Sequence, residues 1–232
     1  MSSSKYAAVF ARFRSLLALA LMVLALSLLS HHFLTADNGW NILRQISVNL
    51  CLSIGMTLVI LSGGIDLSVG AILALAGAVA AGLLKNGVAL PAIGVTLEFT
   101  TAGAILAGLA VGGAAGWANG FVITRFKLPP FVATLGMFSI ARGLTMLWTG
   151  GFPITGLGDN FGYLGTGSFI GMPMPVWIML ALTGIFVVLT KRTRFGRHLY
   201  AVGGNERAAL LTGLNVSRIK IAVYTLAGAL AG

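Results

Sequence analysis

The chain has 232 residues, of which 57% are hydrophobic and only 9% charged, and its mean hydropathy is +0.96. A soluble domain carries about 25% charged residues, so the composition excludes a water-soluble globular protein and indicates an integral membrane protein. The net charge of +10 comes from basic clusters that lie between apolar stretches. Such clusters orient membrane proteins with their basic loops inside, which argues against a nucleic-acid-binding protein.

The apolar stretches predict an all-α membrane protein, a polytopic bundle of transmembrane helices. About 20 apolar residues are needed to cross the hydrocarbon core. The basic clusters belong on the cytoplasmic side, so an even number of crossings must separate consecutive clusters, and the N-terminus is expected in the cytoplasm. The clusters are Lys5 with Arg12 and Arg14, Arg125 with Lys127, and the stretch 191–220. The predicted spans are 15–34 (uncleaved), 46–63, 68–84, part of 88–123, 130–149, 173–190 and one that begins at Ile219.

Two of these spans are irregular. Residues 88–123 are too many for one straight helix and too few for two full crossings, so we expect a short or re-entrant helical piece to about Glu98, followed by a full span. The last span is cut short after about 14 residues, which would leave unsatisfied backbone groups in lipid. We therefore expect residues 1–232 to be one transmembrane domain that is truncated at its C-terminus.

"LSGGIDLSVG", residues 61–70, places an aspartate in a chain that otherwise avoids charge. The glycines beside Asp66 allow the backbone to turn or unwind, so this segment is the predicted junction of two spans, or a break between two half-helices. Asp66 or Ser68 would then cap a helix that starts near Leu67. The alternatives for Asp66 are a structural bond between helices, direct contact with a passing substrate, and a role in relaying motion.

Glycines recur every four residues in "GLAVGGAAGWANG", residues 108–120. This spacing puts them on one face of a helix, where small residues let two membrane helices approach closely. The pattern predicts a tight helix contact rather than a transport role. The glycines are Gly108, Gly112, Gly116 and Gly120.

Arg142, in "MFSIARGLTM", is the second costly group inside a predicted span. It could snorkel to the interface or pair with an acid, for which Asp66 and Glu98 are the candidates, and pairing is favoured over sugar binding. Further polar candidates for a translocation path are expected to face the bundle. They are Asn49, Asn119 and Thr134.

Residues 191–218 form a basic, polar stretch between two spans and predict a cytoplasmic loop. Within it, Asn205 is a suitable N-cap for a helix over 206–211, Glu206 complements the helix dipole, and Gly213 can end the helix. A capped two-turn helix that protrudes from the membrane is suited to docking on another protein. An ordinary basic loop is the alternative.

"ERAALLTGLNV", residues 206–216, resembles the coupling loop of ABC importer permeases, with Ala208 and Ala209 followed after three residues by Gly213. The usual pattern starts Glu-Ala-Ala, whereas here Arg207 occupies the glutamate position and Glu206 comes one residue earlier. With this departure from the usual pattern, the sequence resembles the sugar-importing branch of these permeases.

Three long stretches in the same order strengthen this resemblance. They are "GMTLVILSGGIDLSVGAILALAGAVAA" (55–81), "FVATLGMFSIARGLTM" (131–146) and "TRFGRHLYAVGGNERAALLTGLNVSRIKI" (193–221). Together they look like the ribose/xylose/arabinose-type permeases of ABC importers. The resemblance implies a bacterial inner-membrane subunit that pairs with a second permease copy, receives sugar from a periplasmic binding protein and is driven by an ATPase with two nucleotide-binding domains. It also implies that the ATPase-coupling residues are Asn205, Glu206, Ala208, Ala209, Leu210 and Gly213.

Other functional classes find less support in the residues. None of the five lysines follows a glycine, so the chain has no phosphate-binding loop of the GxxxxGK type. No catalytic pair or triad is readable, His31 and His32 are adjacent and cannot share one helix face, and we expect neither a metal nor a cofactor. An ion-coupled secondary transporter should show acidic or histidine relays in several spans, and a structural scaffold would not need the capped helix. An ABC permease for a nucleoside, an amino acid or a furanose remains the main alternative.

Overall fold

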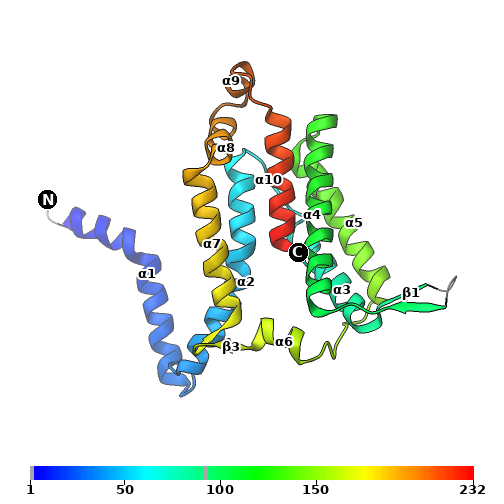
Figure 1. The fold of residues 1–232 in the computed structure, drawn as a ribbon. Helices are drawn as coiled ribbons and strands as arrows, with labels where there is room; N and C mark the ends of the chain where they lie inside the picture. Colours follow the sequence, from blue (N-terminus) through cyan, green and yellow to red (C-terminus); the bar gives the residue numbers. More distant parts are fainter. Residues whose placement is uncertain (1–2, 91–93) are drawn as a thin grey trace. The chain divides into compact units, whose positions relative to one another are not determined.

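The computed structural model describes residues 3–90 and 94–232, with side chains from residue 13 onward. The chain divides into two compact units, Met1–Gln45 and Ile46–Gly232. The first contains α1 (Ser3–Leu29) and the start of α2 (Ala36–Leu61), separated by a short turn. The remaining helices are α3 (Val69–Asn86), α4 (Thr101–Phe126), α5 (Pro130–Thr149), α6 (Asp159–Thr166), α7 (Met174–Arg192), α8 (Arg194–Gly204), α9 (Glu206–Leu211) and α10 (Val216–Ala231) (Figure 1).

Among the described residues, five helices are long and apolar enough to cross a membrane: α2, α3, α4, α5 and α7. The apolar part of α1, Phe13–Leu29, and α10 are shorter. The predicted class, an all-α polytopic bundle, is therefore confirmed. Span 130–149 matches α5 at both ends, and span 173–190 matches α7 within two residues. The first span is displaced, because α1 ends at Leu29 rather than residue 34.

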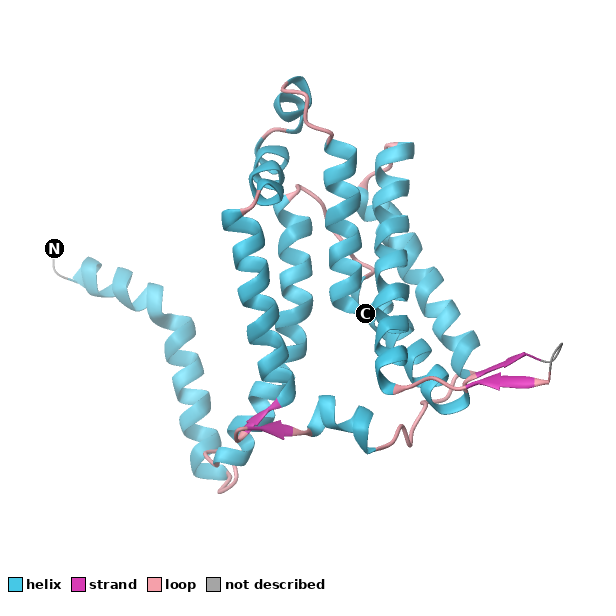
Figure 2. Cartoon of the chain, in the orientation of Figure 1, coloured by secondary structure: helices cyan, strands magenta, loops and turns pink. Residues whose placement is uncertain are grey.

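The predicted re-entrant helix before Glu98 is wrong. Here β1 (Val88–Leu90) pairs antiparallel with β2 (Val95–Leu97), with Val88 opposite Leu97 (Figure 2). β-branched residues such as Val88, Val95 and Thr96 favour an extended backbone. The two strands satisfy part of each other's backbone hydrogen-bond donors and acceptors. A second short pair, β3 (Ser168–Phe169) with β4 (Met172–Pro173), precedes α7.

The glycine ladder of α4 packs against α10, as predicted for a close helix contact. A Cβ atom on Gly116 would collide with the carbonyl oxygen of Tyr224 and lie 3.1 Å from the Cα of Gly228. On the opposite side, a Cβ on Gly228 would lie 2.9 Å from the Cα of Gly116. Because both surfaces lack side chains at the contact, the two backbones approach more closely than ordinary helices do. Gly112 and Gly120 meet the backbone of α10 in the same way, whereas Gly108 lies against Gly232, directly after α10, and against Ala76 of α3.

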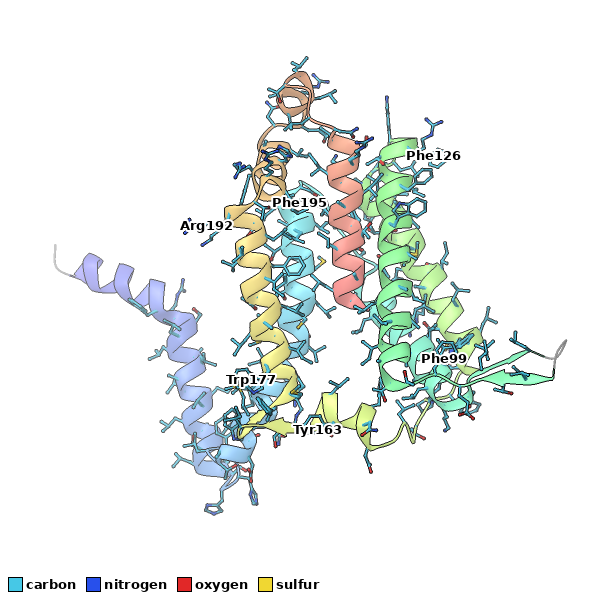
Figure 3. All side chains as sticks on the ribbon, viewed as in Figure 1. Phe99, Phe126, Tyr163, Trp177, Arg192 and Phe195 are labelled. Carbon is cyan, nitrogen blue, oxygen red and sulfur yellow. The ribbon has the colours of Figure 1, made fainter. Side chains whose placement is uncertain are left out.

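One apolar cluster joins the helices at the basic end of the second unit. It contains Leu58 and Val59 from α2, Leu199 from α8, Ala209 from α9 and Tyr224 from α10, all buried. The labelled Arg192, Phe195 and Phe126 lie at this end in Figure 3, whereas Phe99, Tyr163 and Trp177 lie at the opposite end. Within this unit, the basic residues near 125–127 and those after 190 therefore share one side, as the even crossing number predicts.

Candidate functional site

A non-helical linker separates α2 from α3, at the position where the sequence predicts a break. Gly63 has a φ angle of +75°, which L side chains rarely adopt. Gly64 is enclosed, because a Cβ on it would lie 2.5 Å from the hydroxyl oxygen of Tyr224. The chain therefore leaves α2 at Leu61 and re-enters the bundle through residues 62–68 before α3 begins at Val69.

A buried polar network forms at the end of this linker. The backbone N–H of Ser68 donates to Oδ1 of Asp66 at 2.8 Å, and the Ser68 hydroxyl donates to the same oxygen at 2.6 Å. Asn119 of α4 donates from Nδ2 to Oγ of Ser68 at 2.9 Å. Asp66 is only 2% exposed. The network thus connects Ser68, the residue directly before α3, to Asn119 of α4.

Two further side chains hold the linker backbone. Oγ1 of Thr134, on α5, accepts from the N–H of Leu67 at 3.2 Å, and the hydroxyl of Tyr224, on α10, donates to the carbonyl oxygen of Ile65 at 3.2 Å. Irregular backbone at membrane depth is tolerated only where its polar groups find partners. Helices α5 and α10 supply such partners, so the linker has a defined path.

The predicted helix cap needs a correction. Ser68 does occupy the N-cap position of α3, which starts at Val69, near Leu67 as predicted, but the Ser68 side chain makes no capping hydrogen bond. The Ser68 hydroxyl is engaged by Asp66 instead. Asp66 accepts from a backbone N–H two residues later, which makes a local turn before the helix.

The predicted pairing of Arg142 with an acid is wrong. Within the described part of the chain Arg142 forms no ion pair, so neither Asp66 nor Glu98 is its partner. Asp66 is buried and bonds to Ser68, and Glu98 directly follows β2 of the hairpin. Arg142 lines a cavity of about 440 Å³ between α3 and α5.

The prediction that Asn49 faces the bundle is wrong, because Asn49 is exposed on α2. The buried residues of α2 include Ser47, Gly55 and Leu58. Asn49 follows Ser47 by two positions, about 200° around the helix, so it points away from that face. Asn119 and Thr134, in contrast, are both buried as expected.

The short helix α9 has the predicted bounds and both predicted caps. The side chain of Asn205 accepts from the N–H of Ala208 at 3.0 Å. At the other end, Gly213 has a φ angle of +84°. The N–H of Gly213 donates to the carbonyl oxygen of Leu210, and the N–H of Leu214 donates to the carbonyl oxygen of Ala209. This pair of bonds is a Schellman motif, which ends a helix sharply. The caps therefore fix the direction of α9 although it has only six residues.

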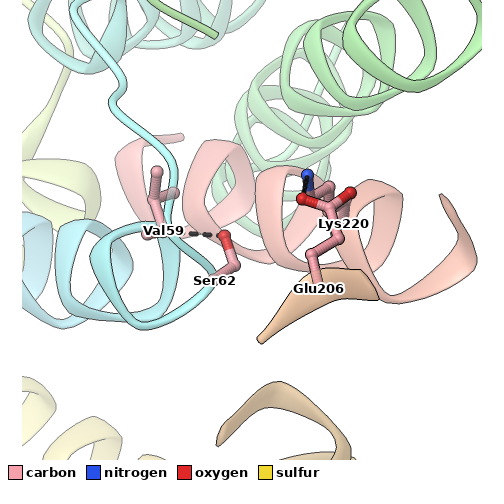
Figure 4. Close-up of polar contacts among 4 residues, drawn as sticks. All are labelled: Val59, Ser62, Glu206 and Lys220. Carbon is pink, nitrogen blue, oxygen red and sulfur yellow. Dashed lines mark hydrogen bonds and ion pairs between the residues drawn. The ribbon is translucent and has the colours of Figure 1, made fainter. Parts of the chain in front are cut away.

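The two sides of α9 differ in character. Ala209 is buried in the apolar cluster, whereas Leu210 and Leu211 are 62% and 88% exposed. Glu206 accepts from Nζ of Lys220 at 2.8 Å, so its carboxylate is held by α10 of the same chain (Figure 4). The helix thus presents two leucines outward while it is anchored inward.

Sequence reasoning missed a contact between α8 and the end of α2. A Cβ on Gly203 would collide with the carbonyl oxygen of Leu61 and lie 3.0 Å from its carbonyl carbon. The next residue, Ser62, is buried and donates from Oγ to the carbonyl oxygen of Val59 at 2.7 Å, which closes the end of α2 (Figure 4). Gly203 and Gly204 are the last two residues of α8, and only the tertiary contact distinguishes them.

Comparison with known proteins identifies the class that this bundle defines. Residues 39–232 match the family described as branched-chain amino acid transport system / permease component, and the chain belongs to this family. The predicted resemblance to sugar importer permeases is confirmed by individual relatives. The chain is 45% identical to the ribose import permease protein of Bacillus subtilis over 92% of its length, and 45% identical to that of Escherichia coli over 94%.

A more distant relative is named for another sugar. The D-allose transport system permease protein of Escherichia coli is 38% identical over 89% of the chain and 60% of the relative. The chain spans 64% of the Bacillus subtilis ribose permease and 66% of the Escherichia coli one. No solved structure matches the chain.

Proposed function

We propose that the chain is the permease subunit of an ATP-driven importer that carries a monosaccharide, D-ribose or a similar sugar, across the bacterial inner membrane. The observation that carries this proposal is the 45% identity to ribose import permeases over more than nine-tenths of the chain. Relatives named for D-allose, L-arabinose and galactofuranose support a sugar cargo. The family description names amino acids, so another small solute is the alternative.

The partners follow from this class of transporter. The permease works with a second permease copy, an ATPase with two nucleotide-binding domains, and a periplasmic sugar-binding protein. The positive-inside rule assigns the basic end of the second unit, with α8 and α9, to the cytoplasm, and the N-terminus to the same side. The loop 191–218 then faces the ATPase.

In this proposal, α9 is the element that docks on the ATPase. The exposed Leu210 and Leu211 supply apolar area, which contributes about 25 cal/mol for each Å² that is buried on docking. The caps at Asn205 and Gly213 hold the helix in one direction before contact, so little ordering entropy is lost. Glu206 and the buried Ala209 act indirectly, because both attach the helix to the rest of the permease.

The contact between Gly203 and Leu61 offers a route by which movement of α9 reaches the membrane. Helix α8 precedes α9 directly and touches the last residue of α2 without a side chain between the backbones. Any shift of α8 therefore pushes on the linker 62–68. That linker ends at Asp66 and Ser68, which set the start of α3. Asp66, Ser68 and Asn119 are assigned this positioning role, since their polar atoms bond to one another.

The experiment that tests this proposal is reconstitution. The permease, co-purified with its ATPase, is placed in liposomes. ATP is supplied on the ATPase side of the membrane, and the sugar-loaded binding protein is added on the opposite side. We expect accumulation of labelled D-ribose that requires both ATP and the binding protein, and no competition by L-leucine. Uptake without the ATPase would instead establish a secondary transporter, and uptake of leucine would replace the sugar assignment.

Docking through α9 is tested with a matched pair of variants. The double variant with Leu210→Ser and Leu211→Ser should lose ATPase co-purification and D-ribose uptake while the permease still inserts. The control is Ile170→Ser, because Ile170 is an equally exposed apolar residue (79%) at the opposite end. Retention of the ATPase by the double variant would contradict the assignment of α9.

A further inference from the structure

Arg142 is a cation in a membrane-spanning helix with no internal partner. It makes no ion pair and no side-chain hydrogen bond among the described residues. A charge at the bilayer centre costs about 2.5–3.5 kcal/mol on insertion scales, and such residues mark water-filled cavities and substrate paths. The cost is met if the guanidinium faces a wet or ligand-filled space.

An open cavity that could hold water or a ligand lies beside the exposed Arg142. The cavity of about 440 Å³ is lined by Phe138, Arg142 and Thr145 of α5 and by Gly70 and Ala74 of α3. Small-molecule sites typically have volumes of roughly 300–1,000 Å³. A Cβ on Gly70 would meet nothing within 4 Å, so the α3 wall is open toward the cavity.

The walls of the cavity are fixed at both ends. Toward the linker, Thr134 of α5 accepts from the N–H of Leu67, and toward the hairpin, Nε1 of Trp148 donates to the carbonyl oxygen of Ala78 at 3.0 Å. Between these bonds, the buried Ala141 packs in a small apolar cluster with α3. The spacing between α3 and α5 is therefore set by built contacts on each side of Arg142.

The chemistry of the lining suits a neutral, polyhydroxylated molecule. A guanidinium offers five N–H donors, and sugar hydroxyl oxygens accept such bonds. The Thr145 hydroxyl donates to Ala141 at 2.8 Å and retains acceptor capacity for a sugar O–H. Phe138 gives an apolar face for the C–H side of a sugar ring. No carboxylate lines the cavity, so an ammonium group would be left without a counter-ion.

We propose that Arg142 and the α3–α5 cavity form a subsite that contacts the sugar during translocation, with Thr145 as a second polar contact. This inference rests on the proposed function and specifies where that cargo passes. The site holds sugar weakly, because a single flexible cation and a hydroxyl provide few directed bonds. Weak holding is compatible with a step that must also release its cargo.

Cysteine labelling tests the cavity directly. In a Cys51→Ser background, Thr145→Cys is compared with Leu147→Cys, which lies two residues away on α5 and is 81% exposed outside the cavity. The reconstituted transporter is treated with a membrane-impermeant thiol reagent during ATP turnover, with D-ribose-loaded or sugar-free binding protein. We expect the cavity cysteine to react and to be protected several-fold by D-ribose. The control should react slowly and without protection, because an exposed side chain on a membrane-spanning helix outside the cavity faces lipid, which the reagent does not enter. Equal behaviour of the two cysteines would overturn the subsite.

A second measurement keeps the test independent of labelling. Arg142→Gln should lower D-ribose uptake on the order of tenfold, as expected for the loss of a hydrogen bond from a charged group, while ATP hydrolysis changes less than about twofold. Arg142→Lys should restore part of the uptake. Unchanged uptake in Arg142→Gln would refute the subsite alone, whereas absence of D-ribose uptake in the unmodified transporter would refute the proposed function itself.

Discussion

Replacement of Gly116 by alanine should destabilise the bundle sharply, while the same change at Gly113 should not. Gly116 is in the ladder that faces α10, and a Cβ there would collide with the carbonyl oxygen of Tyr224 and lie 2.9 Å from its carbonyl carbon. At Gly113 the nearest atom to an added Cβ would be the Cβ of Ala229 at 3.8 Å, which is ordinary contact. The two sites share the helix, the substitution and the gain in helix propensity.

The magnitude follows from these contacts. Carbon atoms rest at about 3.5–4.0 Å, so Gly116→Ala forces α4 and α10 apart by a good fraction of an ångström. Overpacking costs about 1–3 kcal/mol, and a backbone carbonyl cannot rotate away as a side chain does. Alanine recovers up to about 1 kcal/mol of helix propensity at either position. We therefore expect Gly113→Ala to be about 2–3 kcal/mol more stable than Gly116→Ala.

Reversible unfolding in mixed detergent micelles, followed by circular dichroism, measures this difference. The displacement should also reach the linker, since Gly116 contacts the backbone of Tyr224, whose hydroxyl holds Ile65. The fluorescence of a probe on the linker should accordingly change in Gly116→Ala only. Equal unfolding free energies for the two variants would show that the ladder does not set the distance between the helices.

Three further predictions concern the coupling path. Gly203→Ala places a methyl group against Leu61 and should lower sugar uptake per ATP hydrolysed. Gly204→Ala should not, because its added Cβ meets nothing within 4 Å. Uptake and ATPase assays on the same liposomes compare the two variants. Asn205→Ala removes the α9 cap at a cost of about 1 kcal/mol and should weaken ATPase binding roughly fivefold in a titration. Asp66→Ala leaves buried donors unsatisfied, which costs about 1–3 kcal/mol, and should lower the melting temperature by several degrees; an unchanged melting temperature would contradict the network.

Local patterns in the sequence were sufficient to predict several parts of the fold. The α9 helix is determined by its own ends, because Asn205 and Gly213 bond to backbone groups only a few residues away. The α4 ladder is readable because its glycines repeat over more than three turns. Its partner surface on α10 is not readable, since Gly228 and Gly232 give a single repeat. Only the packed structure shows that these two glycines complete the contact.

The failures have a common physical cause, which is dependence on contacts with another segment of the chain. The hairpin at 88–97 forms because two short segments pair, and neither segment alone is long enough to signal a strand. Asn49 is excluded from the bundle by the rotation of α2, which buried contacts at Ser47 and Gly55 set. The special status of Gly203 depends on Leu61, more than a hundred residues earlier in the chain.

The polar residues at membrane depth separate into two groups by the partners that they have. Asp66, Ser68, Thr134 and Tyr224 all bond to the linker backbone or to one another, so their polarity is explained by an irregular backbone that lipid could not satisfy. Arg142 has no such partner within the described structure and lines a cavity between α3 and α5, whose spacing is fixed by hydrogen bonds. A charged group whose cost the fold does not offset must face water or a ligand, and both are compatible with a translocation path. For this reason the arginine, rather than the more conspicuous aspartate, is the residue whose loss should alter transport without altering stability.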